Sequence, residues 1–539
     1  MIDPRKQIGN KLHLAQTLTQ AGIIRPTRLD KLVRVGLALN KWGPTPAAGY
    51  TASAVRFPND TALIDELGTL TFGEIEQRSN ALARAWVNAG LVEGDGIAIM
   101  CRNHRGFIDA TVACSKLGAH ALFLNTAFAA PQITDVVKRE KPAALVYDEE
   151  FEELTRDAGK RRKRYVAWHD GAQKANDPLL EDLIAGGDPA PLDAPLEKGR
   201  VVILTSGTTG TPKGASRKQP ESLDPAAALF SKIPLKARQH TMIAAPLFHS
   251  WGFAHFTLGL GLSSTLVLRR KFDPEDTLSA IAQHECTVLA VVPVMLQRML
   301  ELEPEVIDKY DVRSLRVIAA SGSALPGELA IKVMDRFGDV LYNLYGSTEV
   351  AWATIATPKD LRAAPGTAGK PPRGTVVRLL DEAGKEVPRG ETGRIFVGNE
   401  MMFDGYTGGG NKDMIDGLMS SGDVGHFDEG GRLFVDGRDD EMIVSGGENV
   451  FPREVEDLIS DHEAIDEVAV VGVDDEKFGQ RLKAFAVKTK GKNVTEAELQ
   501  AYVKKNLANF KTPREVEFMK ELPRNATGKV LKRELVEKG

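Results

Sequence analysis

Residues 201–214 read Val-Val-Ile-Leu-Thr-Ser-Gly-Thr-Thr-Gly-Thr-Pro-Lys-Gly. The apolar start predicts a buried strand, which runs directly into a loop of glycine, serine and threonine that carries one lysine, Lys213. Glycines let backbone N–H groups converge on an anion, hydroxyl groups add donors, and the lysine adds a positive charge. The segment therefore predicts a phosphate-binding loop, because a plain surface turn would explain the glycines but not the threonines, the serine and the lysine.

This loop differs from the P-loop of kinases and NTPases, whose pattern is G-x-x-x-x-G-K-[ST]. Counted from Gly207, the second glycine would fall on Pro212, and Gly214 follows Lys213 where serine or threonine is required. A count from Gly210 fails as well. The sequence therefore indicates a phosphate loop of another kind.

Strands and helices alternate on both sides of the loop. Thr71 and Glu74 form a predicted capping box, and apolar residues recur behind them at helical spacing. Short apolar runs at 96–100, 143–147, 288–292, 315–319 and 340–342 predict buried strands. Such alternation predicts mostly parallel sheets covered by helices, an α/β fold.

The pattern changes near residue 374, where strands at 376–380, 393–397 and 432–435 are separated by turn residues. We expect a small β-rich subdomain at about 374–438, within a large N-terminal domain of residues 56–438. Strands at 468–472 and 482–487 and a helix after Thr495 predict a smaller α+β C-terminal domain, residues 439–539. Residues 1–55 predict a helical lead-in.

Composition excludes several classes of protein. The chain has 539 residues, with 42% hydrophobic and 27% charged residues, a net charge of −5 and a pI near 6.1. This balance argues against nucleic acid as the main partner. We expect the three separated cysteines, Cys101, Cys114 and Cys286, to be buried thiols. No signal peptide or membrane-spanning stretch is apparent, so we expect a cytoplasmic protein without an integral membrane segment.

The lead-in contains a rough apolar stripe with basic residues between its members. The stripe consists of Leu29, Leu32, Val33, Val35, Leu37 and Leu39. Two interpretations follow: a helix at a membrane surface, or a helix that packs against the main body. The sequence favours packing and leaves a peripheral membrane contact open.

The phosphate loop resembles the signature of the adenylate-forming superfamily, which comprises acyl-CoA synthetases, firefly luciferase and the adenylation domains of peptide synthetases. Further family motifs follow in the family's order, and the resemblance covers about residues 55–539. It implies a large N-terminal body followed by a mobile C-terminal domain, and an enzyme that uses ATP, Mg²⁺ and coenzyme A.

The segment Tyr345-Gly-Ser-Thr-Glu349 matches the family's Y-G-x-T-E motif. The resemblance implies that Tyr345 packs on adenine, that Thr348 contacts the α-phosphate or the carboxylate, and that Glu349 helps to hold Mg²⁺, which prefers oxygen ligands. Asn343 stands where the family reads the adenine amine, and residues 321–325 resemble the turn beside the adenine.

Ser421-Gly-Asp423 matches the family's T-G-D motif, with serine in place of threonine. A carboxylate suits a ribose diol because it accepts two hydroxyl hydrogen bonds. By resemblance, Asp423 binds the ribose and Arg438 accompanies it. The nucleotide residues that we predict are Thr205, Ser206, Gly207, Thr208, Thr209, Gly210, Ser321, Gly322, Ser323, Asn343, Tyr345, Gly346, Ser347, Asp423 and Arg438.

The C-terminal motifs imply a moving domain. Asp440 occupies the family's hinge position, and Gly446 and Gly447 fall where a loop lines the thiol tunnel after the domain rotates. Residues 523–529 match the family's P-x-x-x-x-G-K motif, and this match makes Lys529 the predicted catalytic lysine. Lys213, Thr348 and His249 complete the predicted catalytic set.

The expected reaction has two steps. The substrate carboxylate, already ionised at neutral pH, attacks the α-phosphorus of ATP, so positioning and positive charge carry the catalysis. A thiol then attacks the acyl-adenylate and AMP leaves. We expect coenzyme A as the acceptor, because no fused carrier domain is apparent and residues 510–514 resemble a segment that meets the coenzyme A nucleotide.

The acid is a small molecule that the sequence describes only by class. Residues 246–253 resemble the acyl-pocket motif of fatty acyl-CoA synthetases, with His249 at the gate and Trp251, Gly252 and Phe253 behind it, although a structural role for the histidine is an equal alternative. Small residues at 258–264 leave room for a chain or a ring system. We predict a medium- or long-chain fatty acid, with a bulky polycyclic acid as the alternative.

Three other interpretations of the function stay open at this point. A luciferase-like oxidation has no specific support in the residues. A binding protein without catalysis is disfavoured because Lys213, Glu349, Asp423 and Lys529 are all present. An enzyme that runs only one half-reaction would keep every one of these motifs.

Overall fold

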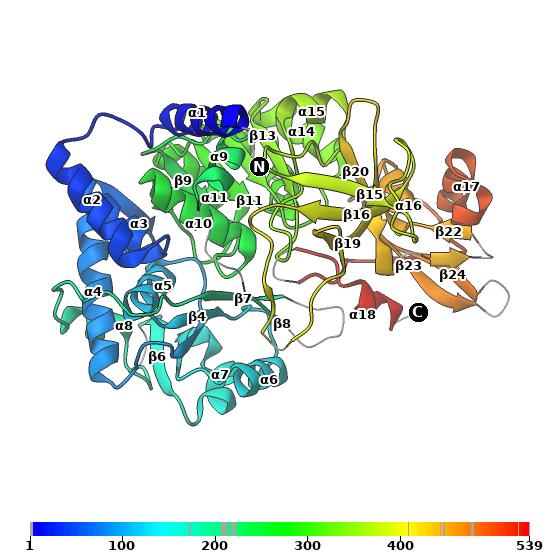
Figure 1. Cartoon of the computed structure of the whole chain (residues 1–539). Helices are drawn as coiled ribbons and strands as arrows, with labels where there is room; N and C mark the ends of the chain where they lie inside the picture. Colours follow the sequence, from blue (N-terminus) through cyan, green and yellow to red (C-terminus); the bar gives the residue numbers. More distant parts are fainter. Residues whose placement is uncertain are drawn as a thin grey trace.

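The structure, a computed structural model, describes residues 4–171, 174–205, 213–216, 222–407, 409–441, 443–445, 448–475, 479–525 and 528–537. The chain forms two large sheets, whose strands interleave along the sequence, a small antiparallel sheet and a C-terminal sheet (Figure 1). Among the described helices, none has the length and apolar character needed to cross a bilayer.

The largest sheet has eight strands, and its inner pairs are parallel, as the strand–helix alternation predicts. Its two edge strands are antiparallel to their neighbours. In spatial order the strands are β14 (Thr354–Ala356), β13 (Leu341–Tyr345), β12 (Val317–Ala320), β11 (Val288–Val291), β9 (His240–Ile243), β10 (Thr265–Val267), β1 (Thr61–Asp65) and β2 (Gly68–Thr71).

The second sheet has seven strands and contains the strand that precedes the phosphate loop. In order they are β17 (Gly405–Tyr406), β8 (Lys213–Ser216), β7 (Val201–Thr205), β4 (His120–Phe123), β3 (Gly96–Met100), β5 (Ala144–Asp148) and β6 (Lys163–Trp168). From β7 to β6 the pairs are parallel, while β8 runs antiparallel to β7. The chain therefore reverses direction between β7 and β8, across the predicted phosphate loop.

Helices cover both sheets. They are α3 (Pro46–Arg56), α4 (Phe72–Asn88), α5 (Arg105–Leu117), α6 (Ala130–Glu140), α7 (Glu152–Gly159), α8 (Leu180–Ala185), α9 (Asp224–Phe230), α10 (Ser250–Leu262), α11 (Pro274–Gln283), α12 (Pro293–Leu300), α13 (Pro304–Asp308), α14 (Gly327–Phe337) and α15 (Pro358–Ala363). The predicted capping box forms, since Thr71 Oγ1 accepts from the Glu74 amide at 3.1 Å and Glu74 accepts from the Thr71 amide at 2.7 Å.

The predicted β-rich segment forms an antiparallel sheet. It comprises β15 (Val376–Leu380), β16 (Gly393–Gly398), β18 (Met414–Ile415), β19 (Leu418–Phe427) and β20 (Leu433–Arg438). The C-terminal segment comprises β21 (Ile443–Ser445), β22 (Glu448–Val450), α16 (Pro452–Ser460), β23 (Ile465–Asp475), β24 (Gly479–Lys488), α17 (Glu496–Asn506), β25 (Glu515–Met519) and α18 (Lys532–Val536). Its strands bury apolar clusters of their own, while the domain boundary near Asp440 stays a prediction.

The first two helices, α1 (Pro4–Gln20) and α2 (Leu29–Trp42), lie on the outside of the main body (Figure 1). The expectation that the stripe of α2 packs against the body is wrong for most of its residues. Ala38 and Trp42 are the buried residues of α2, and α2 packs on α3. The stripe faces outward instead, because small Ala38 and flat Trp42 fit closely against the alanine-rich α3.

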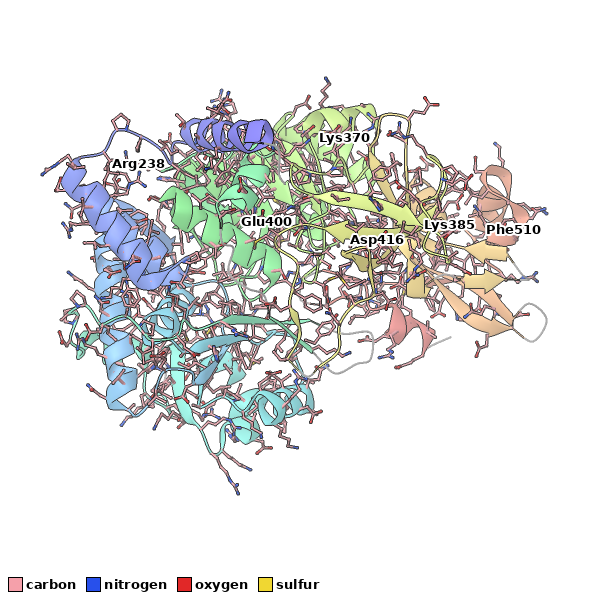
Figure 2. All side chains as sticks on the ribbon, viewed as in Figure 1. Arg238, Lys370, Lys385, Glu400, Asp416 and Phe510 are labelled. Carbon is pink, nitrogen blue, oxygen red and sulfur yellow. The ribbon has the colours of Figure 1, made fainter. Side chains whose placement is uncertain are left out.

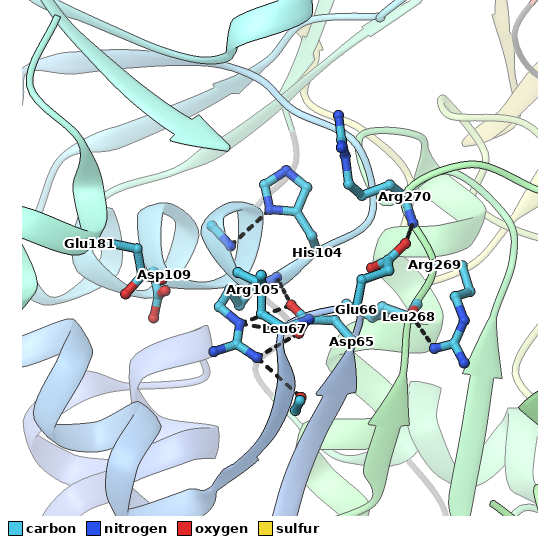
Figure 3. Close-up of polar contacts among 12 residues, drawn as sticks. Asp65, Glu66, Leu67, His104, Arg105, Asp109, Glu181, Leu268, Arg269 and Arg270 are labelled. Atoms are coloured by element: carbon cyan, nitrogen blue, oxygen red, sulfur yellow. Dashed lines mark hydrogen bonds and ion pairs between the residues drawn. The ribbon is translucent and has the colours of Figure 1, made fainter. Parts of the chain in front are cut away.

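A buried ion pair joins the two large sheets (Figure 3). Asp65 ends β1 in the eight-stranded sheet, and Arg105 begins α5, which follows β3 of the seven-stranded sheet. The Arg105 side chain donates to Asp65 at 2.5 Å from Nη2 and at 3.0 Å from Nε, and the Arg105 amide donates to the same carboxylate at 3.0 Å. The Asp65 side chain has no exposed surface and that of Arg105 is 9% exposed, so the pair is largely shielded from water.

Asn103 makes a second junction two residues earlier. Its side-chain amide donates to the Ile243 and Ala245 carbonyls at 3.1 and 2.9 Å and accepts from the Leu247 amide at 2.8 Å. Ile243 ends β9 of the eight-stranded sheet, and Ala245 and Leu247 follow it. The turn between β3 and α5 therefore fixes the relative position of the two sheets, and an apolar cluster with members from both fills the space between them.

We predict that Asp65→Ala lowers the free energy of unfolding by about 3–5 kcal/mol, because it leaves the Arg105 guanidinium buried without its counter-charge. Denaturant or thermal unfolding of the purified variant measures the loss. Asp311→Ala is the matched control, since the Asp311–Arg313 pair is exposed and its removal should not shift the midpoint. Equal midpoints for both variants would contradict a structural role for the junction.

Candidate active site

A cavity of ≈ 1540 Å³ lies where the large sheets, the β-rich sheet and the C-terminal segment meet. Its lining includes the ends of β7, β12 and β13 and the start of β8, that is, the carboxyl ends of three strands of the α/β body. Ligands of open α/β sheets bind in the crevice outside these strand ends. The cavity is therefore the candidate active site.

One wall holds the two residues that the sequence assigns to the adenine. Asn343 and Tyr345 stand two positions apart on β13 and so project from the same side of the strand into the cavity. The Asn343 side chain is 7% exposed, and its Oδ1 has no hydrogen-bond partner among the described residues. A buried acceptor without a donor is costly, so this atom fits a ligand that brings an N–H group, as the adenine amine does.

The turn after β12 lines the same part of the cavity. Ser321, Gly322 and Ser323 are all lining residues, and Gly322 has a φ of +94° in the left-handed region. A side chain at Gly322 would also come within 3.3 Å of Val292. The sequence therefore needs glycine at the centre of this turn.

Asp423 is held by three neighbours on the opposite wall. The Tyr345 hydroxyl donates to Asp423 Oδ2 at 2.5 Å, and Arg438, the cross-strand partner of Asp423, donates to Oδ1 at 3.4 Å. The Ser421 hydroxyl oxygen lies 3.2 Å from the Tyr345 hydroxyl oxygen and accepts from the Asp423 amide at 3.1 Å. The substituted serine of the S-G-D motif therefore supports both residues of the pair.

The protonation of this pair follows from its burial. Burial raises the pKa of Asp423 above its ordinary value, while Arg438, the Tyr345 hydroxyl and Lys529 act to lower that pKa. Burial and the adjacent carboxylate raise the pKa of Tyr345 well above its ordinary value. The phenol therefore stays protonated and serves as the hydrogen-bond donor to Asp423.

Glu349 and Lys213 meet at Tyr406. The Tyr406 hydroxyl donates to Glu349 Oε1 at 2.8 Å, and Lys213 Nζ lies 5.2 Å from the centre of the Tyr406 ring. The Ser250 and Thr348 hydroxyl groups hydrogen bond at 2.8 Å. A carboxylate and a hydroxyl group that line the cavity are oxygen ligands of the kind that Mg²⁺ prefers, so this donor set fits the ion.

Lys529 reaches the cavity from the C-terminal segment. Its amide donates to Asn525 Oδ1 at 2.9 Å, and its charge acts on Asp423. Gly528 has a φ of +78°, and a Cβ there would lie 2.2 Å from Val294 of α12. The predicted G-K pair thus needs glycine at 528 to bring Lys529 against the main body.

The predicted acyl residues lie at and after the start of α10. His249 precedes the helix, lines the cavity, and has its pKa lowered to about 4 by desolvation. Trp251 donates from Nε1 to the Val291 carbonyl at 3.0 Å, and Phe253 packs on Phe123. Gly252 is required by a close approach, because a Cβ would lie 2.2 Å from the Pro246 carbonyl oxygen.

Some predicted residues are not placed by these contacts. Ser206, Gly207, Thr208, Thr209, Gly210, Gly446 and Gly447 lie outside the described residues. Thr205 ends β7, and Asp440 lies in a 3-10 turn between β20 and β21. Gly346 and Ser347 line the cavity. Phe510 lies on the far side of the C-terminal segment and is absent from the cavity lining (Figure 2).

Sequence reasoning assigned no site role to four residues that line the cavity. Tyr406, which contacts both Glu349 and Lys213, gave no spacing signal in its glycine-rich surroundings. Ser250 was visible only as part of the acyl segment. Val35 and Leu39 of α2 line the cavity as well, and their stripe was the available signal.

The sequence model of the AMP-binding enzyme family matches residues 50–407, and that of the AMP-binding enzyme C-terminal domain matches residues 454–529. The structure of ATP-bound MatB from Rhodopseudomonas palustris superposes with a TM-score of 0.81 at 27% identity, over 91% of this chain and 98% of that one.

Two curated relatives are similar over nearly their whole length. Feruloyl-CoA synthase from Amycolatopsis is 31% identical over 89% of this chain and 96% of the relative. The 3-[(3aS,4S,7aS)-7a-methyl-1,5-dioxo-octahydro-1H-inden-4-yl]propanoyl:CoA ligase from Mycobacterium tuberculosis is 31% identical over 90% and 97%. The chain therefore belongs to the AMP-binding enzyme family, as an adenylate-forming acid–thiol ligase that uses ATP, Mg²⁺ and coenzyme A.

Proposed function

We propose that this ligase activates a medium- or long-chain fatty acid as its acyl-adenylate and transfers the acyl group to coenzyme A. The observation that carries the proposal is the extent of the cavity. One continuous space has Asp423 and Lys529 at one end and apolar residues of α9, α10 and the N-terminal helices at the other. A carboxylate at the nucleotide end would leave its hydrocarbon chain in the apolar part.

The apolar part suits a monocarboxylic acid. Leu229 and Phe230 of α9 line it together with Trp251 and Leu258 of α10. Neither α9 nor α10 contains a lysine or an arginine, so the walls that these two helices form offer no partner for a second carboxylate, and the cations of the cavity lie elsewhere, among them Arg56 of α3. Apolar surface favours a hydrocarbon chain by about 25 cal/mol per Å² removed from water.

In the first step, the ionised substrate carboxylate attacks the α-phosphorus of ATP and pyrophosphate leaves. We assign Lys213, Lys529 and the backbone amides of residues 205–210 to the developing phosphate charge, with Thr348 at the α-phosphate or the carboxylate. Asn343 and Tyr345 hold the adenine, and Asp423 with Arg438 holds the ribose. Glu349 would hold Mg²⁺, which would supply positive charge for the phosphates.

In the second step, the thiol of coenzyme A attacks the acyl carbonyl carbon, the thioester bond forms, and AMP leaves with the electrons of the broken anhydride bond. We assign the hinge to Asp440 and the thiol tunnel to Gly446 and Gly447. His249 and its neighbours Trp251, Gly252 and Phe253 form the gate and wall of the acyl pocket.

A bulky polycyclic acid is the second candidate. The relative from Mycobacterium tuberculosis is named for a methyl-dioxo-octahydroindenyl propanoyl acid, and this chain shares 31% identity with it. Small residues of α10, among them Gly261, line the cavity and leave width for fused rings.

A panel of acids separates the two candidates. Pyrophosphate release from ATP and Mg²⁺ is measured with fatty acids of graded length and with fused-ring propanoic acids, each with and without coenzyme A. We expect the highest kcat/KM for a medium- or long-chain fatty acid and formation of its thioester. Release with the fused-ring acids alone would replace the first proposal by the second.

We predict that Lys529→Ala lowers the adenylation rate by at least about 10²-fold, the scale of losing one electrostatic stabiliser of a transition state. Thioester formation from a supplied acyl-adenylate should be retained, because no phosphate charge develops in that step. Lys520→Ala is the control, an exposed lysine near the same end of the chain, and should leave both rates unchanged. An equal loss of rate in both half-reactions of Lys529→Ala would contradict the assignment of Lys529 as the catalytic lysine of the adenylation step.

We predict that His249 does not contribute a titration to the pH–rate profile. Its pKa of about 4 lies below the ordinary value, so the ring is neutral above that pH and becomes protonated only below it. The pH–rate profile of His249→Gln should therefore keep its shape between about pH 5 and pH 8. The variant should raise the KM for the acid, because His249 forms the gate of the proposed acyl pocket. Loss of a step near pH 6.5 in the variant would show that the ring titrates.

A further inference from the structure

The outward face of α2 is apolar, the reverse of an ordinary surface helix. Five large aliphatic side chains of α2 are at least half exposed: Leu29 at 77%, Leu32 at 50%, Val33 at 55%, Leu37 at 63% and Leu39 at 50%. At about 100° per residue they span an arc of about 160° around the helix axis. The inner side is occupied by Ala38 and Trp42, so the stripe is not the face that holds α2 to the protein.

Positive charge surrounds this face. Residues 25–56, which comprise α2 and its flanking segments, contain six lysines and arginines and one aspartate, a net charge of +5, whereas the whole chain carries −5. Arg25, Arg34 and Arg56 make no ion pair with a carboxylate in the part of the chain that the structure describes. Burial and the charges of Arg25 and Arg238 lower the pKa of Arg56, so these cations lie near one another. Arg238 lies beside the connection from α1 to α2 (Figure 2).

The same face is continuous with the active-site cavity. Leu39 is half exposed and also lines the cavity, together with Val35 of α2 and Arg56 of α3, so the cavity opens beside α2. The opening is held in place by α3. Gly49 lets α3 approach α10 so closely that a Cβ would lie 2.8 Å from Leu260, and Ser53 hydrogen bonds to Ser263 at 2.9 Å.

We propose that α2 docks on an anionic lipid bilayer and that the apolar acid enters the cavity from the lipid through the opening beside α2. A helix with an apolar outward face and flanking basic residues lies in the interface of a bilayer, where both the aliphatic side chains and the charges find partners. Docking stands independently of the substrate. Entry of the acid from the lipid rests on the proposed fatty-acid function.

A second copy of the chain fits this face less well. Packing through α2 would bring two sets of unpaired arginines together, which is unfavourable. A helix of 14 residues is also only about 21 Å long and about 10 Å wide, well below the ~800 Å² per partner of a standard protein interface. The family match begins at residue 50, so α1 and α2 lie before the matched region.

Co-sedimentation with vesicles tests the docking. The full-length protein is mixed with phosphatidylcholine vesicles with and without phosphatidylglycerol. We expect binding to the anionic vesicles that weakens as salt is added. The variant Leu29→Gln, Leu32→Gln, Val33→Gln, Leu37→Gln should bind at least about tenfold more weakly. Its matched control changes Leu67, Val92, Leu196 and Val376 to Gln, which are also exposed, and should bind as the parent does.

The charge contribution has its own variant. Arg25→Gln with Arg34→Gln should weaken binding to the anionic vesicles by about fivefold per charge and leave binding to neutral vesicles unchanged. Thermal midpoints equal to that of the parent show that both sets of variants are folded. Equal vesicle binding by the parent and the α2 variant, or no binding by the parent, would overturn the proposal. A parent dimer that the α2 variant dissolves would assign the face to a second copy instead.

Measurements of activity distinguish docking of α2 on the bilayer from entry of the acid through the lipid. A long-chain acid supplied within anionic vesicles is compared with a short, water-soluble acid. The α2 variant should lose at least about tenfold in rate with the vesicle-borne acid and keep its rate with the soluble one. Equal rates with the vesicle-borne acid would overturn entry from the lipid. If the parent binds vesicles but activates no fatty acid in either form, the fatty-acid function fails while the docking stands.

Discussion

The active site depends on the buried pair of Asp65 and Arg105. Each of the two large sheets has its own hydrophobic packing, but packing alone is non-directional and would let one sheet slide over the other. The carboxylate–guanidinium contact and the neighbouring Asn103 contacts are directional, and they sit in the turn that joins β3 to α5. Because both sheets present strand ends to the cavity, a small shift at this turn would separate the groups that must meet one ATP molecule.

The sequence predicted the α/β fold because strand–helix alternation and capping boxes are local signals. It predicted Asn343, Tyr345 and Asp423 because they lie in or beside short segments that resemble motifs of the adenylate-forming superfamily. The ends of the strands were predicted less well. For example, β13 runs to Tyr345, beyond the predicted 340–342. Asn343 interrupts the apolar run in the sequence, but in the structure it lines the cavity. Contacts such as Tyr406 with Glu349, or Ser250 with Thr348, join residues 57 and 98 positions apart, and no local pattern records them.

The first two helices show a different limit of prediction from sequence. Their apolar stripe was evident in the sequence, but the side of α2 that would be covered depends on Trp42, whose large ring takes the inner position. Periodicity tells which residues share a face and leaves open whether that face meets protein, lipid or water. The decision came from the packing of Ala38 and Trp42 on Ala47 and Ala48 of α3, a tertiary contact.

The hydrogen bond from Tyr345 to Asp423 has a consequence for nucleotide choice. The phenol donates to the same carboxylate that the proposed role gives to the ribose. A sugar that reaches the carboxylate competes with an internal donor, and the displaced phenol must find another acceptor or lose about 1–3 kcal/mol. A sugar with two adjacent hydroxyl groups can compensate this exchange, whereas one that lacks a hydroxyl recovers less. Under the proposed ribose role of Asp423, Tyr345 is an internal competitor for the carboxylate, and this competition favours a sugar that brings both hydroxyl groups.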